Sequence, residues 1–404
     1  MSDAGRAGTQ GPGLLGNPSL AALRRRTSQK WRTYPDDVLP SFVAEMDFDL
    51  ARPVIDAVAE SMTASDAGYG HGGRLGEAFA GFAARRFGWS PDPARVFAIP
   101  DVMTGIAEMI TALTPPGSGV VISPPVYAPF FSRVGFTGRR VVEAPLRRRD
   151  DGGYELDAEA LDRALSQDGV SAYILCSPHN PVGRVWTAQE LTTVAGICHA
   201  RGVLVLADEI HAPLVLPGAA QVPFLSLDHP VTARTIAFTS ASKGWNIPGL
   251  KCGLAIAGSP ELATVLTERW EALVPGLLGM HASVAAFEQA TGWLDAVLAQ
   301  LDRNRGLLAT LLAEHLPQIR YRPPEASFLA WLDCRELGGA AGGAAGGGLG
   351  GGDDPAAGFL ERGRVALASG TDFGTQGRGF ARLNIGTTEP LLAEAVRRMT
   401  AALG

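Results

Sequence analysis

Lys243 is the residue of this sequence whose type most clearly suggests covalent chemistry. Lys and Arg together number 35, yet only three of these residues are lysines: Lys30, Lys243 and Lys251. Arginine therefore serves wherever only a positive charge is required. A lysine kept in such a chain indicates that an amine is needed, because an amine can lose its proton and form a Schiff base while arginine stays protonated.

The residues around Lys243 predict where it lies. Residues 235–238 form a short apolar run that is typical of a buried strand, and residues 239–246 then read T-S-A-S-K-G-W-N. We expect Lys243 on the loop at the carboxyl end of this strand, where open α/β sheets bind their ligands. The alternative interpretation is a solvated surface lysine.

Other apolar runs are also followed by polar segments. The segments with side chains for acid–base chemistry, hydrogen bonding or stacking are P-P-V-Y at 124–127, S-P-H-N-P at 177–181 and D-E-I-H at 208–211. A strand predicted at 96–99 runs into Asp101 and then a helix predicted at 106–113. Such a turn presents free N–H groups to an anion such as phosphate.

Three competing motif interpretations each lack a required partner. S-x-x-K at 240–243 is typical of penicillin-binding enzymes, but neither S-D-N nor K-T-G occurs. Residues 203–209 could be a Walker B strand, but no lysine follows a glycine, so no Walker A motif exists. Asp208, Glu209 and His211 could bind a metal, but Asp208 and Glu209 point to opposite faces of an extended segment. We therefore expect no metal site.

The elements that must position these residues alternate between strand and helix as far as about residue 290. Continuous apolar runs, such as 173–175 and 203–206, are typical of strands buried on both faces, and helical stretches such as 188–201 separate them. We predict a doubly wound, mostly parallel sheet. A long amphipathic helix at 293–312 then opens a smaller part with strands near 321 and 328–332.

We divide the sequence into four parts. Residues 1–20 are rich in Gly and Pro and should form a disordered arm, and residues 21–50 should pack with the small domain. The large domain covers residues 51–290 and the small domain residues 291–404. Within the latter, residues 338–352 are almost wholly Gly and Ala and predict a mobile surface loop.

Composition limits the class of protein. A chain of 404 residues is too long for one compact core, and its net charge of −6 argues against nucleic acid as a partner. Four cysteines without a C-x-x-C pair indicate neither a zinc site nor a disulfide framework, so we expect a cytoplasmic setting. The first 20 residues lack the apolar core of a signal peptide, and no run of 18 apolar residues could span a membrane.

Taken together, the loops resemble those of fold-type-I pyridoxal phosphate (PLP) enzymes, and among them the MalY/PatB group of cystathionine β-lyase-like relatives of the class I/II aminotransferases. The resemblance runs from about Lys30 to the C-terminus. It implies PLP as cofactor and a seven-stranded sheet with helices on both faces plus a smaller α+β domain. Its motifs are V-A-E-M-D-F at 43–48, P-V-Y-A-P-F at 125–130, P-H-N-P-V-G-R-V-W at 178–186, D-E-I-H at 208–211, S-A-S-K at 240–243 and R-L-N at 382–384.

The resemblance implies a role for each residue around the cofactor ring. Lys243 would hold PLP as a Schiff base and, once displaced, remove the Cα proton of the substrate. Asp208 would pair with the pyridine nitrogen, and Asn180 would hydrogen-bond the ring oxygen O3′ with His211 close by. Tyr127 would stack on the ring. The alternatives are a core histidine and a tyrosine that only packs.

The resemblance also implies a phosphate cradle. The phosphate would lie on the backbone N–H groups of Val102 and Met103, with side-chain donors from Ser240, Ser242 and Lys251. This role would account for the third lysine of the chain.

Two further residues would act on the substrate side and between subunits. Arg382 would clamp the substrate carboxylate with a bidentate fork that lysine could not copy; the alternative is a surface arginine. Tyr69 resembles a tyrosine that reaches the phosphate from the neighbouring subunit. The resemblance therefore implies a homodimer with shared active sites.

The implied reaction is an α,β-elimination from an L-cysteine S-conjugate such as L-cystathionine. Lys243 removes the Cα proton, the β-thiolate leaves, and the remainder hydrolyses to pyruvate and ammonia. Transamination needs the same lysine and stays open, as does a specialised biosynthetic C–S lyase or oxidative deaminase acting on a bulky thioether. A non-enzymatic regulator is a further alternative, against which the presence of Lys243, Asp208 and Arg382 argues.

The sequence departs from the pattern of the group mainly near the substrate. Glu45 stands where the acidic motif usually reads A-D-M-D-F, and Trp245 stands where Phe is commoner. The loop at 68–73 contains a literal G-x-G-x-x-G, but a predicted helix precedes it, so we do not interpret it as a dinucleotide site. We therefore expect the cofactor chemistry to follow the group more closely than the choice of substrate.

Overall fold

The computed structural model describes residues 14–71, 73–337 and 353–404. The predicted disordered arm lies outside the described residues as far as residue 13, and the predicted Gly-rich loop at 338–352 lies outside them entirely. The end of the arm differs from the prediction, because Leu20 begins a short helix, α1 (Leu20–Leu23). Ser19 caps this helix, its Oγ accepting the Ala22 N–H at 3.2 Å.

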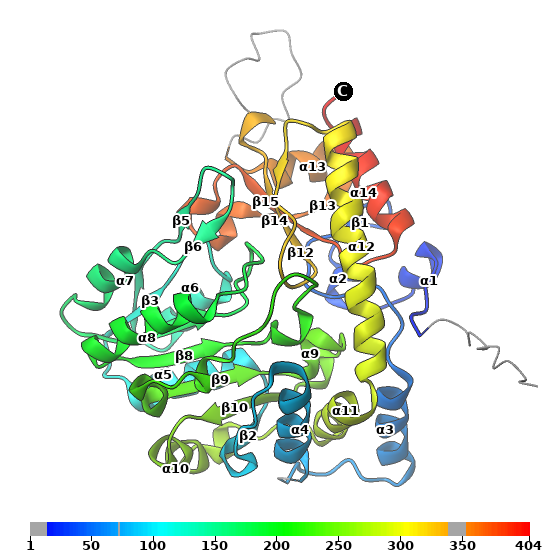
Figure 1. Cartoon of the computed structure of the whole chain (residues 1–404). Helices are drawn as coiled ribbons and strands as arrows, with labels where there is room; N and C mark the ends of the chain where they lie inside the picture. Colours follow the sequence, from blue (N-terminus) through cyan, green and yellow to red (C-terminus); the bar gives the residue numbers. More distant parts are fainter. Residues whose placement is uncertain (1–13, 72, 338–352) are drawn as a thin grey trace, which may run out of the picture.

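A seven-stranded sheet forms the centre of the larger part of the molecule (Figure 1). The strand order is β2-β10-β9-β8-β7-β3-β4, and within it β10 runs antiparallel to both of its neighbours. The predicted fold class, a mostly parallel sheet in an α/β protein, is therefore confirmed. The strands are β2 (Val96–Ile99), β3 (Gly119–Ile122), β4 (Arg140–Glu143), β7 (Val170–Cys176), β8 (Leu204–Asp208), β9 (Thr235–Thr239) and β10 (Gly253–Ala257).

Helices cover both faces of this sheet, which explains its continuous apolar runs. Side chains of β7 alternate between two cores, with Ala172 and Ile174 in one and Tyr173 and Leu175 in the other. The first core includes residues of α5 (Val102–Leu113), α6 (Pro129–Phe136) and α10 (Pro260–Glu268). The second includes residues of α3 (Arg52–Thr63), α4 (Leu75–Phe87), α7 (Ala158–Leu165), α8 (Ala188–Arg201) and α11 (Leu277–Gln289).

A second, antiparallel sheet follows the long helix α12 (Thr291–His315). Its order is β11-β12-β15-β14, and α13 and α14 lie in the same part of the chain (Figure 1). The bounds are β11 (Arg320–Tyr321), β12 (Leu329–Asp333), α13 (Pro355–Gly363), β14 (Ala368–Ser369), β15 (Phe380–Asn384) and α14 (Glu389–Ala401). Near the N-terminus, β1 (Leu39–Pro40) pairs in parallel with β13 (Val365–Ala366). The domain boundaries at 50 and 290 stay predictions.

Capping residues fix the first residues of α8 and α5, the two helices that begin near the site described below. Thr187 and Glu190 form a capping box at the start of α8. Helix α5 begins at Val102, earlier than the predicted 106–113. The reason is that Asp101 caps it, with Oδ1 accepting the Thr104 N–H at 2.8 Å. The predicted anion site thus lies at a true helix N-terminus.

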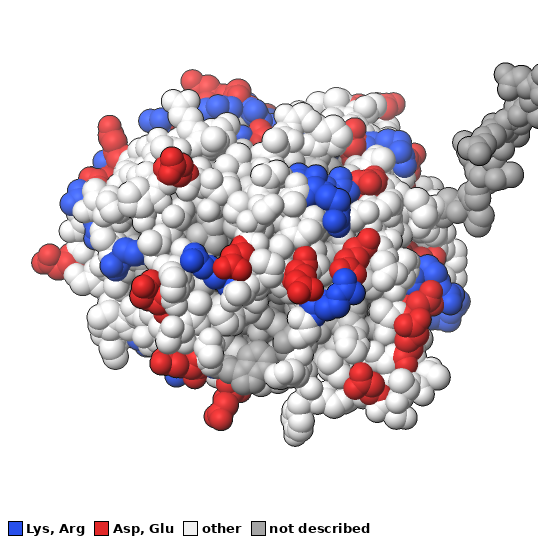
Figure 2. Space-filling view, turned by 60° about the horizontal axis from the view of Figure 1, so that its bottom comes forward, with Lys and Arg blue, Asp and Glu red and all other residues white. Residues whose placement is uncertain are grey.

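The surface shows no preference for a single charge sign on the face drawn in Figure 2. Acidic and basic side chains are interspersed there, without a basic stripe of the kind that binds nucleic acid. Within the described ranges, no helix combines the length and the apolar character that a membrane span requires.

Candidate active site

A cavity of about 540 Å³ lies beside the carboxyl ends of β7, β8 and β9. Most of the predicted site residues line it, because the carboxyl ends of parallel strands meet at one edge of the sheet. They are Val102, Met103, Tyr127, Asn180, Asp208, His211, Ser240, Ser242, Lys243 and Lys251. Of the remaining two, Arg382 reaches the cavity through Asn180 and Tyr69 lies elsewhere.

Lys243 lies in α9 (Ala241–Gly244), a single helical turn directly after β9, and not in an irregular loop as predicted. Ser240 caps this turn, which is why the chain becomes helical there. The Lys243 Nζ donates to the carbonyl of Ala44 at 2.8 Å. Burial, followed by the positive charge of Arg382, lowers the pKa of Lys243 to about 8. The neutral amine is therefore accessible close to neutral pH.

Asp208 ends β8 as a buried carboxyl group opposite Cys176 of β7. Its Oδ1 accepts the N–H of Ile210 at 3.1 Å. Burial raises the pKa of Asp208 to about 7, and the hydrogen bond and the charge of Lys243 oppose this only in part. A ligand with a protonated ring nitrogen next to Asp208 would lower the pKa of this carboxyl group again and so favour its ionised form.

The opposite end of the cavity suits an anion. Val102 and Met103 are the first residues of α5, so their N–H groups have no acceptor within the helix. Two hydroxyl groups, of Ser240 and Ser242, lie 2.7 Å apart and line the same end together with Lys251. Backbone N–H groups, hydroxyl groups and an ammonium group are the usual donors to phosphate.

Both His211 and Tyr127 are uncharged near neutral pH. Burial, with the positive charges of Lys243 and Arg382, lowers the pKa of His211 to about 3, and its Nδ1 has no hydrogen-bond partner. Burial and the charge of Asp208 raise the pKa of Tyr127. These two rings can pack against a ligand and form hydrogen bonds, but neither supplies a charge.

Arg382 lies on β15 and is only 7% exposed. Its Nη1 donates to Asn180 Oδ1 at 3.1 Å and its Nη2 to the carbonyl of Phe42 at 2.9 Å, while its buried Nε has no partner. The guanidinium carbon lies 4.8 Å from the centre of the Phe373 ring. Burial lowers the pKa of Arg382 to about 10, so it remains charged at neutral pH. A buried donor without an acceptor suits a carboxylate ligand.

Tyr69 lies outside the cavity and is 96% exposed. Its backbone forms an isolated bridge with Gly276. Leu50, Ile55 and Met62 are also exposed. The role of Tyr69 in a neighbouring subunit stays a prediction.

Sequence reasoning missed several residues of the site. Asp101, which we interpreted only as a turn residue, lines the cavity and forms an ion pair with Lys251, and Arg133 and Cys176 line it too. Lys30 was left without a role and is 2% exposed. An acidic residue inside an otherwise apolar segment, as in V-A-E-M-D-F, was the available sign that a buried cation lies nearby.

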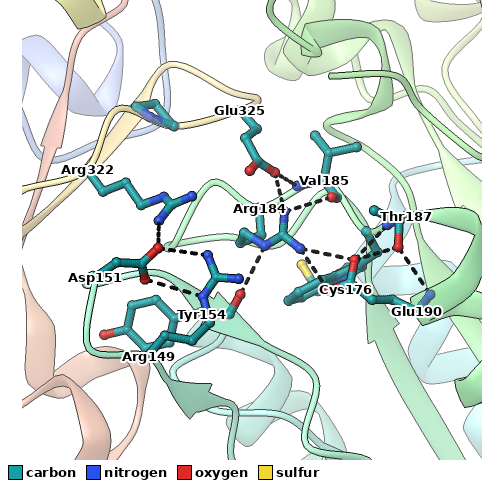
Figure 3. Close-up of polar contacts among 12 residues, drawn as sticks. Arg149, Asp151, Tyr154, Cys176, Arg184, Val185, Thr187, Glu190, Arg322 and Glu325 are labelled. Atoms are coloured by element: carbon teal, nitrogen blue, oxygen red, sulfur yellow. Dashed lines mark hydrogen bonds and ion pairs between the residues drawn. The ribbon is translucent and has the colours of Figure 1, made fainter. Parts of the chain in front are cut away.

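Arg184 holds the loop that carries Asn180, since its carbonyl accepts the His179 N–H at 2.8 Å. Figure 3 shows the other contacts of Arg184. Its Nε donates to the carbonyl of Tyr154 at 3.0 Å, its Nη2 to Glu190 Oε1 at 2.8 Å and its Nη1 to Glu325 Oε2 at 2.6 Å. Glu190 belongs to α8, and Glu325 precedes β12 of the smaller sheet. The side chain of Arg184 therefore joins the Asn180 loop to both parts of the molecule.

Comparison with known proteins identifies relatives along nearly the whole chain. Residues 43–399 match the family described as aminotransferase class I and II. A putative cystathionine beta-lyase of Mycobacterium leprae is 46% identical over 393 residues, which cover 95% of this chain and 97% of that protein. Cystathionine beta-lyase PatB of Bacillus subtilis is 33% identical, over 91% of this chain and 93% of its own. The crystal structure of cystalysin from Treponema denticola, which contains a pyridoxal 5′-phosphate cofactor, has a TM-score of 0.88 at 26% identity and covers 97% of this chain and 98% of its own.

Proposed function

The chain belongs to the class I and II aminotransferase family, and we propose that within it the protein is a PLP-dependent carbon–sulfur β-lyase. The proposed substrate is L-cystathionine or another L-cysteine S-conjugate, which is cleaved to a thiol, pyruvate and ammonia. Relatives named cystathionine beta-lyase support this proposal. The observation that carries it is the amine of Lys243 beside one cavity with the buried Asp208 and Arg382.

The residues around the cavity fit PLP. Asp208, whose pKa burial raises to about 7, would keep the ring nitrogen protonated. Asn180 Oδ1 is engaged by Arg382, which leaves its Nδ2 to donate to the ring oxygen. Tyr127 and His211 would pack against the ring. The phosphate would be held by Val102, Met103, Ser240, Ser242 and Lys251. When bound, PLP supplies a sink for the electron pair of the broken Cα–H bond.

Lys243 and Arg382 would act on the substrate. The free Nε of Arg382 and one of its Nη groups would bind the α-carboxylate by a bidentate fork. The neutral Lys243 amine would take the Cα proton, because its low pKa keeps the lone pair available. The Cβ–S bond then breaks, its electron pair leaves with the thiolate, and water converts the three-carbon remainder to pyruvate and ammonia.

Transamination is the second candidate, because the family match itself favours it and the same lysine serves both reactions. A specialised C–S lyase or oxidative deaminase for a bulky thioether would also use these residues. We would incubate the protein with PLP and L-cystathionine, without any 2-oxo acid. The β-lyase releases pyruvate and free thiol in equal amounts. Transamination leaves the C–S bond intact and releases no thiol, so conversion of the substrate amino group that required an added 2-oxo acid would transfer the proposal to transamination.

We also propose a homodimer with shared active sites. Tyr69 is too exposed to serve its own cavity, and Leu50, Ile55 and Met62 add apolar surface on the same part of the chain. Mixing Lys243→Ala and Tyr69→Ala subunits should restore activity to about a quarter of the wild type, because one of the two sites in each mixed dimer then carries both side chains. Mixtures as inactive as their parents would contradict shared sites.

We propose the cytoplasm as its location. Among the described residues, all four cysteines are buried free thiols, as a reducing compartment allows. Fractionation of cells that produce the tagged protein would test this.

A further inference from the structure

Five consecutive main-chain carbonyls, of residues 42–46, accept hydrogen bonds from side chains; we call this segment the strap. Functional side chains take two of them, since Arg382 donates to Phe42 O at 2.9 Å and Lys243 to Ala44 O at 2.8 Å. The other donors are Asn384 Nδ2 to Val43 O at 2.7 Å and to Glu45 O at 2.6 Å, Lys30 Nζ to Glu45 O at 3.1 Å, Asn246 Nδ2 to Met46 O at 2.8 Å and Arg26 Nη1 to Met46 O at 3.5 Å. The strap thus contacts both groups that would act on the substrate.

The strap is anchored at one end by a buried ion pair. Lys30 Nζ lies 2.8 Å from Asp47 Oδ1, but the geometry is that of an ion pair and not of a hydrogen bond. Lys30 is 2% exposed and Asp47 is 3% exposed. A second anchor is Asn246, whose Oδ1 also accepts the Met46 N–H at 2.8 Å. Removing one partner of the ion pair would leave the other as an unpaired buried charge, and because Lys30 also donates to Glu45 O at 3.1 Å, the pair connects residue 47 to the strap.

The partner of Lys243 is suited to a base. A carbonyl accepts one N–H of a neutral amine and leaves the nitrogen lone pair free, whereas a carboxylate at the same distance would favour the charged ammonium form. The charged groups that face Lys243 are Arg382, Glu45 and Asp208. Ala44 O therefore holds the free amine in place without adding a negative charge next to it.

The partner of Arg382 fixes the orientation of the fork. Phe42 O and Asn180 Oδ1 engage Nη2 and Nη1, and the guanidinium lies over the Phe373 ring. With these three contacts the guanidinium cannot rotate freely, so the N–H bond of its unpartnered Nε points in a fixed direction. A shift of the strap would therefore disturb the amine and the carboxylate fork together.

We propose that Lys30 and Asp47 are positioning residues that hold the strap, so that Ala44 O orients the free Lys243 amine and Phe42 O orients Arg382. The assignment of Lys243 as base rests on the proposed function. The proposal gives a role to Lys30, the one lysine of the chain that the cofactor does not require.

The test uses a neutral replacement of the pair, Lys30→Met with Asp47→Asn, which leaves no buried charge unpaired. The matched control is Arg201→Met with Asp162→Asn, an exposed pair 2.7 Å apart that joins α8 to α7. Asn246→Gly is a second strap variant, because glycine keeps the backbone φ of +57° and loses both hydrogen bonds to Met46. Circular dichroism checks that each variant folds.

The first readout is amine labelling in the cofactor-free protein, followed by mass spectrometry across a pH series. In the wild type, Lys243 should label with a midpoint near pH 8, since its pKa is lowered to about 8. Both strap variants should raise this midpoint by about one pH unit, because a loosened strap admits water to the amine. Lys251, whose side chain is 58% exposed, serves as the internal reference and should not change.

The second readout is the pH profile of thioether cleavage by the PLP-loaded protein. In the strap variants the kcat profile should move to higher pH, and KM should rise about tenfold as the fork loses its orientation. An unchanged Lys243 midpoint in a folded strap variant would overturn the proposal, and if the double variant does not fold, Asn246→Gly decides. A wild type that cleaves no thioether refutes the proposed function alone, since the labelling result does not depend on turnover.

Discussion

The two ends of the cavity are built in different ways. At the cofactor end, Asp208 is the last residue of β8, and Asn180 and Lys243 follow the adjacent strands β7 and β9, so a single sheet edge brings them together. At the substrate end, Arg382 comes from the smaller sheet and meets a strap from the N-terminal part of the chain. One end therefore depends on a regular element, and the other on contacts between segments far apart in sequence.

This difference predicts how each end of the cavity responds to amino-acid substitutions. The sheet edge is fixed by strand pairing and by two apolar cores, so substitutions there should remove one chemical role without moving the others. At the substrate end, Arg382 is paired within the smaller sheet, but its position relative to the strap depends on side-chain hydrogen bonds to carbonyls. Substitutions there should move several groups together.

The largest expected effect is that of Lys243→Ala, which removes the base and the covalent attachment point. Pyruvate release should fall by at least about 10³-fold while the fold, measured by circular dichroism, is unchanged. Retention of activity would mean that another group acts as base and that the cofactor end has been wrongly identified.

The next effect is expected for Asp208→Asn, at the same end. Loss of the charge that keeps the ring nitrogen protonated should lower kcat by about 10²- to 10³-fold with little change in KM. A large rise in KM with an unchanged kcat would show that this residue belongs functionally to the substrate end.

The same variant gives a test of stability in the cofactor-free protein. Burial raises the pKa of Asp208 from 3.8 to about 7, so the folded state keeps a proton that the unfolded state releases. The wild type should therefore lose stability relative to Asp208→Asn as pH rises from 4 to 7, with a constant gap above pH 7 on the order of 4 kcal/mol. Urea unfolding at pH 4, 6 and 8 measures the gap, and a gap that shrank as pH rose would contradict the buried acid.

A smaller effect is expected for Arg382→Lys, at the substrate end. Lysine keeps the charge but loses the fork and the contacts to Asn180 and Phe42. We expect kcat/KM to fall about 10- to 100-fold, mainly through KM, with PLP affinity unchanged. Full activity of Arg382→Lys, together with a clear loss of activity in Arg382→Ala, would show that only charge matters there.

The smallest effect should be that of Arg184→Lys, at a position outside the cavity that joins the Asn180 loop to both parts of the molecule. The loop of Asn180 would keep its backbone but lose part of the connection to Glu190 and Glu325. We expect PLP affinity and KM each to change about three- to tenfold, and Glu325→Gln to reproduce part of this. A change in melting temperature alone would limit Arg184 to a structural role.

The sequence allowed the cofactor end to be predicted because each of its residues directly follows an apolar run or a capped helix start. Asp208 and Lys243 could be placed from strand patterns alone. The strap could not, since most of its hydrogen bonds join residues 199 to 341 positions apart and use carbonyls that every residue type possesses. Lys30 shows the limit most clearly, because its scarcity marked it as special but only the fold shows its partner, Asp47.

The contact between Phe42 and Arg382 spans 340 residues. Because a ribosome makes the chain from its N-terminus, the strap emerges long before β15, since Phe42 precedes Arg382 by 340 residues. The sheet edge with its lysine and acid can form before the carboxylate fork exists. A nascent chain can thus form its cofactor site while synthesis continues, but it can bind an amino acid through Arg382 only after β15 has also been made.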